Sequence, residues 1–78
     1  MDACKDRQYI CNQIAKLLKL TNDGKNLSEI RHYYESGSEY ADITYNIHGH
    51  PYILTVNITG DSDICMIYDI IRKAFLQL

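Results

Sequence analysis

The chain lacks any long apolar run, and its first residues are polar. None of its apolar runs approaches the roughly 20 residues that a helix needs to span a bilayer. The start Met1–Asp6 also lacks the apolar core of a secretory signal peptide. The sequence therefore predicts a cytoplasmic protein without a membrane segment.

An excess of charge is missing as well. Eight Lys and Arg residues stand against ten Asp and Glu residues, which gives a net charge of -2. Contacts with phosphates need clustered basic residues, and the basic residues here are scattered. We therefore expect no direct binding of nucleic acid through a basic surface.

Signatures of catalysis are also absent. The chain has no phosphate-binding loop, nucleotide fingerprint or hydrolase nucleophile elbow. Its three cysteines, an odd number, indicate free thiols in a reducing compartment. A helix N-terminus would lower the pKa of Cys65, but Asp61 and Asp63 oppose that shift. We expect no enzymatic activity.

What the chain does contain is the composition of a folded domain. A hydrophobic content of 46% with 23% charged residues excludes a disordered chain. We expect one domain spanning residues 1–78. Such a small domain buries only about 60 to 65% of the surface that its unfolded chain exposes. A partner, a metal or a weak homodimer contact would then add stability, and a monomer is the other alternative.

Period-two alternation predicts a three-stranded meander. Residues 40–47 and 53–59 alternate on either side of a turn at 47–51. Residues 28–35 form a preceding strand, joined to the next through the turn formers at 36–38. One predicted face is core and carries Ala41, Ile43, Tyr45, Ile47, Leu54, Val56 and Ile58. The other is open and carries Tyr40, Asp42, Thr44, Asn46, Ile53, Thr55, Asn57 and Thr59.

Helical spacing of apolar residues predicts a helix at each end of the chain. The first spans residues 3–20, with Asp2 as a candidate N-cap, and its apolar stripe is Ile10, Cys11, Ile14, Leu17 and Leu18. The second follows Asp61 or Ser62 as N-cap, and its stripe is Ile64, Ile67, Ile71, Phe75 and Leu78. The fold class is therefore α+β in the order α-β-β-β-α, a three-stranded antiparallel sheet with two helices packed on one face.

Two apolar residues of the second helix, Met66 and Ile70, fall off its predicted stripe. They give this helix more apolar surface than one sheet needs. Packing against the first helix is the favoured interpretation. The alternative is an exposed patch that contacts a partner.

The spacing most typical of metal ligands is His48-Gly49-His50. On an extended chain, residues i and i+2 project to the same side, so both imidazoles would meet one zinc or iron ion. Two solvated histidines in a turn are the favoured alternative. Cys4 and Cys65 would lie at the opposite end of the sheet, near helix N-termini, and form a separate site. A structural metal is thus a hypothesis, and no cofactor is certain.

The element order and the ending Ile70–Leu76 (IIRKAFL) resemble double-stranded-RNA-binding domains. Those domains carry lysines at the start of the second helix, where they hold phosphates. This chain has Asp61, Ser62 and Asp63 at that place, and carboxylates there would repel RNA. RNA binding is therefore disfavoured, and a module that binds double-stranded RNA is kept only as the alternative function.

Seven tyrosines, with one phenylalanine and no tryptophan, are an unusual aromatic content. Tyrosine supplies rigid contact area with a polar tip and is enriched in protein interfaces. Tyr33 and Tyr40 would point away from the helices, beside Glu35, Glu39 and Asp42. A solvated sheet face is one interpretation. The other is an acidic, aromatic surface that docks on a basic protein surface.

In size, slight acidity, tyrosine content and lack of catalytic motifs, the chain is similar to the small phage or mobile-element proteins that inhibit CRISPR nucleases. The similarity is one of class. It implies a non-enzymatic inhibitor or adaptor in the host cytoplasm that binds a larger nucleic-acid-processing nuclease and keeps out its nucleic acid. The implied partner-binding residues are Tyr33, Glu35, Glu39, Tyr40 and Asp42, with Met66 and Ile70 on the second helix.

Overall fold

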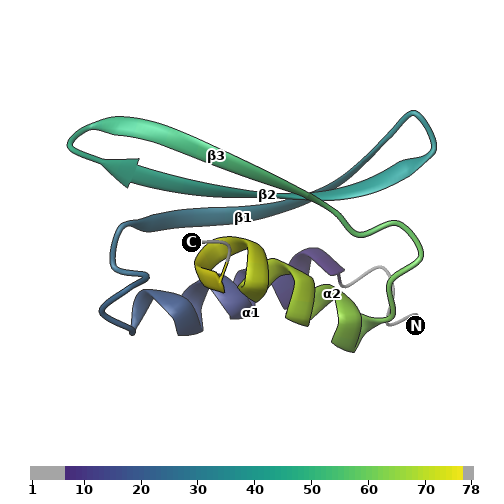
Figure 1. Ribbon diagram of the computed structural model, residues 1–78, viewed down its shortest axis with the longest axis horizontal. Helices are drawn as coiled ribbons and strands as arrows, with labels where there is room; N and C mark the ends of the chain where they lie inside the picture. The colour runs from purple at the N-terminus through teal and green to yellow at the C-terminus, as the bar shows by residue number, and fades with distance from the viewer. Residues whose placement is uncertain (1–6, 77–78) are drawn as a thin grey trace.

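A computed structural model describes residues 7–76 and shows a three-stranded antiparallel sheet with both helices on one of its faces (Figure 1). The elements are α1 (Arg7–Lys19), β1 (Leu27–Glu35), β2 (Ser38–Ile47), β3 (His50–Asn57) and α2 (Asp63–Ile71), which continues into a π-helical turn, η2 (Arg72–Leu76). The strand order is β1-β2-β3. The predicted α+β class and the order α-β-β-β-α are confirmed.

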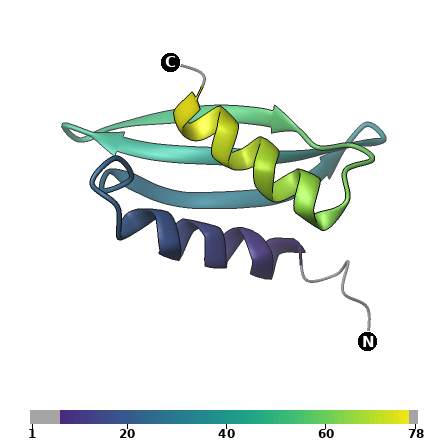
Figure 2. The same ribbon diagram turned by 60° about the horizontal axis from the view of Figure 1, so that its bottom comes forward.

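The two helices cover the sheet differently. Figure 2 shows α1 running alongside β1, whereas α2 and η2 cross the strands diagonally toward β3. The opposite face of the sheet carries no helix from the described part of the chain (Figure 1). Within residues 7–76, no helix is long and apolar enough to cross a membrane.

Helix α1 buries a narrower stripe than its sequence predicts. Cys11, Ile14, Ala15 and Leu18 are buried, in rows three and four residues apart. The prediction for Leu17 is wrong, because this side chain lies beside the stripe and is 62% exposed. The predicted cap Asp2 lies outside the described residues.

Both hairpins close through two residues. Ser36 and Gly37 have φ angles of 52° and 82°, and His48 and Gly49 have φ angles of 53° and 80°. Positive φ at both central residues is the type I′ turn, whose twist matches that of the flanking strands. The second turn is therefore shorter than the predicted 47–51 segment, and β3 begins at His50.

The core lies between the sheet and the helices. Ala41, Ile43 and Ile58 are fully buried, while Tyr45, Leu54 and Val56 pack partly buried against them. This confirms the predicted core face. A register shift between Leu27 and Glu29 is a β-bulge, which lets both Leu27 and Ile30 reach the core although they are three positions apart.

Helix α2 is rotated relative to its predicted stripe. Its N-cap is Ser62, whose Oγ accepts a hydrogen bond from the Cys65 backbone N–H at 3.2 Å. Met66 and Ile70 are fully buried, whereas the predicted core residue Ile64 is 75% exposed. The hypothesis that Met66 and Ile70 form an exposed partner patch is therefore wrong, because both belong to the core. Leu78, also predicted there, lies outside the described residues.

Candidate functional site

The open face of the sheet brings side chains from all three strands together. Residues directly opposite one another on neighbouring strands include Tyr33 with Tyr40. Asp42 of β2 lies opposite Arg31 of β1 on one side and Thr55 of β3 on the other. Residues of this face are Glu29, Arg31, Tyr33, Glu35, Ser38, Tyr40, Asp42, Thr44, Asn46, Pro51, Ile53, Thr55 and Asn57. We call it the open face. It holds four of the predicted partner-binding residues: Tyr33, Glu35, Tyr40 and Asp42.

Tyr33 and Tyr40 stack on one another in this face. Their ring centroids are 5.5 Å apart, with 27° between the ring planes. The Arg31 guanidinium carbon lies 4.6 Å from the centroid of the Tyr33 ring. Offset stacking and a cation–π contact each favour a fixed ring position. The two tyrosines therefore form one ordered aromatic patch.

Asp42, at the centre of β2, holds this patch in place. Its Oδ1 accepts hydrogen bonds from the Tyr33 hydroxyl at 3.1 Å and from the Thr55 hydroxyl at 2.7 Å. Its Oδ2 lies 3.5 Å from Arg31 Nη2. The carboxylate thus links β1, β2 and β3 across the open face.

The open face carries more acidic than basic side chains. Arg31 pairs with Asp42, which leaves the exposed carboxylates of Glu29 and Glu35. Desolvation raises the pKa of Tyr33, as do its hydrogen bond to Asp42 and the nearby charges of Asp42 and Glu35. The phenol therefore stays protonated and donates to Asp42 at neutral pH. The face is aromatic and mildly acidic, with Glu29 in place of the predicted Glu39.

Glu39 does not belong to the open face. Strand β2 begins at Ser38, so the alternation that sends Ala41 and Ile43 into the core also sends Glu39 to the helix side. The Glu39 residue is 8% exposed. Its Oε2 accepts from Arg7 Nη1 at 3.0 Å and from His32 Nε2 at 2.6 Å. The prediction of Glu39 as a partner-binding residue is therefore wrong.

Arg7 is the centre of a second polar cluster, where the start of α1 meets the start of α2. Besides Glu39, it bonds the Asp61 carbonyl oxygen at 2.6 Å and the Asp63 carboxylate at 3.2 Å. Hydrogen bonding with the Asp69 carboxyl, followed by desolvation, raises the pKa of Asp61 to about 6. These contacts fix the two helices to the sheet.

Burial sets the chemistry of the nearby thiol. Desolvation raises the pKa of Cys11 to about 11, although Arg7 opposes the shift. A thiol with a raised pKa is mostly protonated at neutral pH and therefore a weak nucleophile. Cys11 is fully buried, so its role is that of a small core residue, as predicted.

The histidine turn does not have the geometry that the metal hypothesis assumed. His48 and Gly49 both adopt positive φ, so the chain from His48 to His50 is folded back and the extended-chain argument for two imidazoles on one side fails. Cys65 is an exposed free thiol, and Cys4 lies outside the described residues. Over residues 7–76, no group of three or more His, Cys, Asp or Glu side chains is placed to hold a metal ion.

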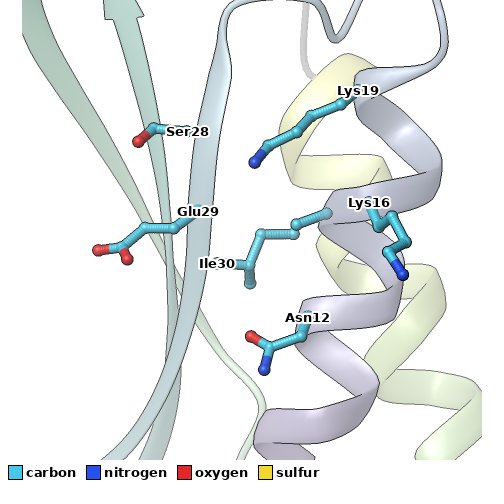
Figure 3. Close-up of a pocket in the computed structure, with 7 residues that line it drawn as sticks. Asn12, Lys16, Lys19, Ser28, Glu29 and Ile30 are labelled. Carbon is cyan, nitrogen blue, oxygen red and sulfur yellow. The ribbon is translucent and has the colours of Figure 1, made fainter.

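A groove of about 310 Å³ runs between α1 and β1. Asn12, Lys16 and Lys19 line its helix side, and Ser28, Glu29 and Ile30 its strand side. Figure 3 shows the Lys19 amine reaching toward β1, while the Glu29 carboxylate points away from the helix. The groove is open and lacks convergent acid and base groups, so its geometry does not suggest a catalytic site.

Two structural residues were missed from the sequence. Gln8 donates to the Ile30 carbonyl oxygen at 2.9 Å and accepts from the His32 backbone N–H at 2.7 Å, so it covers part of the outer edge of β1. Arg7 lacked any local signal, since its partners lie more than 30 positions away. A third missed residue, Arg31 of the open face, does have a local signal, because period-two alternation places it on the same face of β1 as Tyr33.

No protein-family model, curated protein or solved structure matches this chain.

Proposed function

We propose that this chain is a small non-enzymatic protein that inhibits or adapts a larger protein by docking on it through the open face. The observation that carries the proposal is the Tyr33–Tyr40 stack, held by Asp42 and Arg31. Aromatic side chains that are already ordered lose little conformational entropy on binding. Ile53 adds an apolar side chain that is 59% exposed on the same face.

The proposed partner is a larger nucleic-acid-processing enzyme such as a CRISPR nuclease, in the host cytoplasm. Support comes from the size, the net charge of -2 and the tyrosine content of the chain. Glu35 offers an exposed carboxylate next to the aromatic patch, suited to a basic residue of the partner. Docking on one protein domain fits a chain with a net charge of only -2 better than imitation of a whole nucleic acid does.

Direct binding of double-stranded RNA is the less favoured candidate. The start of α2, where a lysine cluster would hold phosphates, carries Asp63 paired with Arg7. Tyr33 is already in contact with Tyr40 and Arg31. A salt titration with duplex RNA tests this alternative separately, since binding through phosphates weakens steeply with salt.

The proposal is tested with a panel of purified, guide-loaded CRISPR nucleases. Target cleavage and complex formation are measured with the wild type, with Tyr33→Ala/Tyr40→Ala and with Glu35→Lys. Tyr68→Ala is the matched control, because Tyr68 is an exposed tyrosine on α2. We expect the open-face variants to lose binding and inhibition while the control retains both. Inhibition that survives the open-face changes, or a panel without any bound nuclease, would contradict the proposal.

A further inference from the structure

The two edges of the sheet are finished differently. Beside β1, the Gln8 side chain occupies the Ile30 carbonyl and the His32 backbone N–H. Beyond β3, no strand among residues 7–76 pairs with the sheet. An unpaired edge presents a row of backbone donors and acceptors to any further strand.

The phase of the ladder shows which groups of β3 face outward. The Ile58 backbone N–H donates to the Glu39 carbonyl oxygen at 2.9 Å, so residue 58 faces β2. Because successive residues alternate, the N–H and C=O groups of Ile53, Thr55 and Asn57 face away from β2. Pro51 falls in the same outward set, the position on an edge strand where a missing N–H costs nothing within the sheet.

Apart from Pro51, the outward edge of β3 lacks the residues that usually prevent pairing. Natural edge strands carry charged residues, especially lysine, to prevent association. The β3 sequence HPYILTVN contains no Asp, Glu, Lys or Arg. Tyr52 and Ile53 are exposed, and Leu54 and Val56 are only partly buried. Only Pro51, near the start of the strand, interrupts the row of donors.

We propose that a second copy of this chain pairs with β3 in antiparallel orientation, about a two-fold axis at Thr55, to give a six-stranded sheet. In this register Ile53 faces Asn57 of the other copy and Thr55 faces Thr55, so every outward N–H has a carbonyl partner. A two-fold axis at Ile53 would instead set Pro51 against Thr55 and lose hydrogen bonds.

The occupant is a second copy because this edge is complementary to itself. Its donors and acceptors match under the two-fold axis, and no side chain of β3 brings like charges together. On the helix side, Leu54 comes opposite Val56 of the other copy, which covers apolar surface left partly exposed in one chain. The inference is independent of the proposed function, although it would place two copies of the open face side by side.

Sedimentation of the full chain over a concentration series up to millimolar tests the proposal. We expect a monomer–dimer equilibrium whose dissociation constant rises roughly tenfold or more in Ile53→Pro, which removes two symmetry-related hydrogen bonds. The Ile53 N–H makes no bond within one sheet, so circular dichroism of this variant should match that of the wild type. A monomer at every concentration, or a dimer unaffected by Ile53→Pro, would overturn the proposal.

Cross-linking tests the register and does not depend on the proline variant. In a Cys4→Ser/Cys65→Ser background, Thr55→Cys places two thiols on Cα atoms about 5.5 Å apart, within disulfide range. Added diamide takes up the two electrons and two protons as the disulfide forms. Thr44→Cys, on the same face but one strand inward, is the matched control. Rapid cross-linking at Thr55 alone supports the register; equal cross-linking at both positions, or none at Thr55, contradicts it.

Discussion

Arg7 Nη1 and Glu39 Oε2 form an ion pair of 3.0 Å that joins the start of α1 to β2, with both side chains almost out of water. Removing one partner of such a pair leaves the other charge poorly solvated. We therefore expect Glu39→Gln to lower the free energy of unfolding by about 2 to 4 kcal/mol, measured by urea denaturation.

The matched control for this prediction is Glu35→Gln, because Glu35 is an exposed carboxylate on the same hairpin. A surface change of this kind should alter the free energy of unfolding by no more than about 0.5 kcal/mol. If the free energy of unfolding falls equally in Glu39→Gln and Glu35→Gln, the ion pair with Arg7 contributes no more to stability than an exposed carboxylate does.

Gln8 should protect the outer edge of β1. Gln8→Ala removes the acceptor of the His32 backbone N–H and the donor to the Ile30 carbonyl. We expect a loss of about 1 to 3 kcal/mol in the free energy of unfolding and faster hydrogen exchange at the His32 amide. Gln13→Ala, at an exposed position of the same helix, is the control. Unchanged exchange at His32 in Gln8→Ala would refute this assignment.

Two glycines should respond to alanine for different reasons. Gly37 has a φ of 82° and open space where a Cβ would lie. Gly37→Ala therefore lowers the free energy of unfolding only because alanine is strained in the left-handed conformation, by about 1 to 2 kcal/mol. At Gly24 a Cβ would lie 2.2 Å from the Leu18 carbonyl oxygen, and the chain after α1 must shift. We expect the melting temperature to fall further for Gly24→Ala than for Gly37→Ala. The reverse order would contradict this tight loop.

Asp61 should make stability depend on pH in the direction opposite to most carboxylates. Asp69 and desolvation raise the pKa of Asp61 from 3.8 to about 6, so folding favours its protonated form. Its stabilising contribution is complete below about pH 4 and is lost as the pH rises through 6. Melting temperatures at pH 4 to 7 should show a smaller decline, or a larger rise, for Asp61→Asn than for the wild type. Parallel curves would contradict the prediction.

The sheet was predictable because its signal is local. Alternation from Tyr40 to Ile47 identifies the core face, and the residues at Ser36-Gly37 and His48-Gly49 mark both turns. The same alternation, extended back two residues, would have placed Glu39 on the helix side. That error came from starting the strand at Tyr40, when it starts at Ser38.

The rotation of α2 could not be read from its sequence in the same way. Ile64, Met66, Ile67, Ile70 and Ile71 surround most of the helix, so more than one apolar stripe is consistent with the pattern. The diagonal crossing of the sheet decides between them and buries Met66 and Ile70. Crossing angle is a property of packed elements, and one helix sequence does not contain it.

The candidate site was predictable as a set of residues and not as an arrangement. Period two placed Tyr33, Tyr40 and Asp42 on one face, and β1 pairs with β2 as expected. The role of Asp42 depends on Thr55 and Arg31, which come from the two outer strands in a register that the turn lengths fix. The five-residue turn that the sequence predicts leaves this register undetermined, whereas the observed two-residue turn fixes it.

The two-residue turns also have a consequence for the order of folding. Each ladder of backbone hydrogen bonds begins beside a two-residue turn and extends along the two strands. The loop-closure entropy lost in forming the meander is therefore small. The Arg7–Glu39 and Arg7–Asp61 contacts instead join segments 32 and 54 positions apart. We expect the transition state to contain the β2 hairpins with the helices still undocked, so that Gly37→Ala slows folding while Glu39→Gln chiefly speeds unfolding.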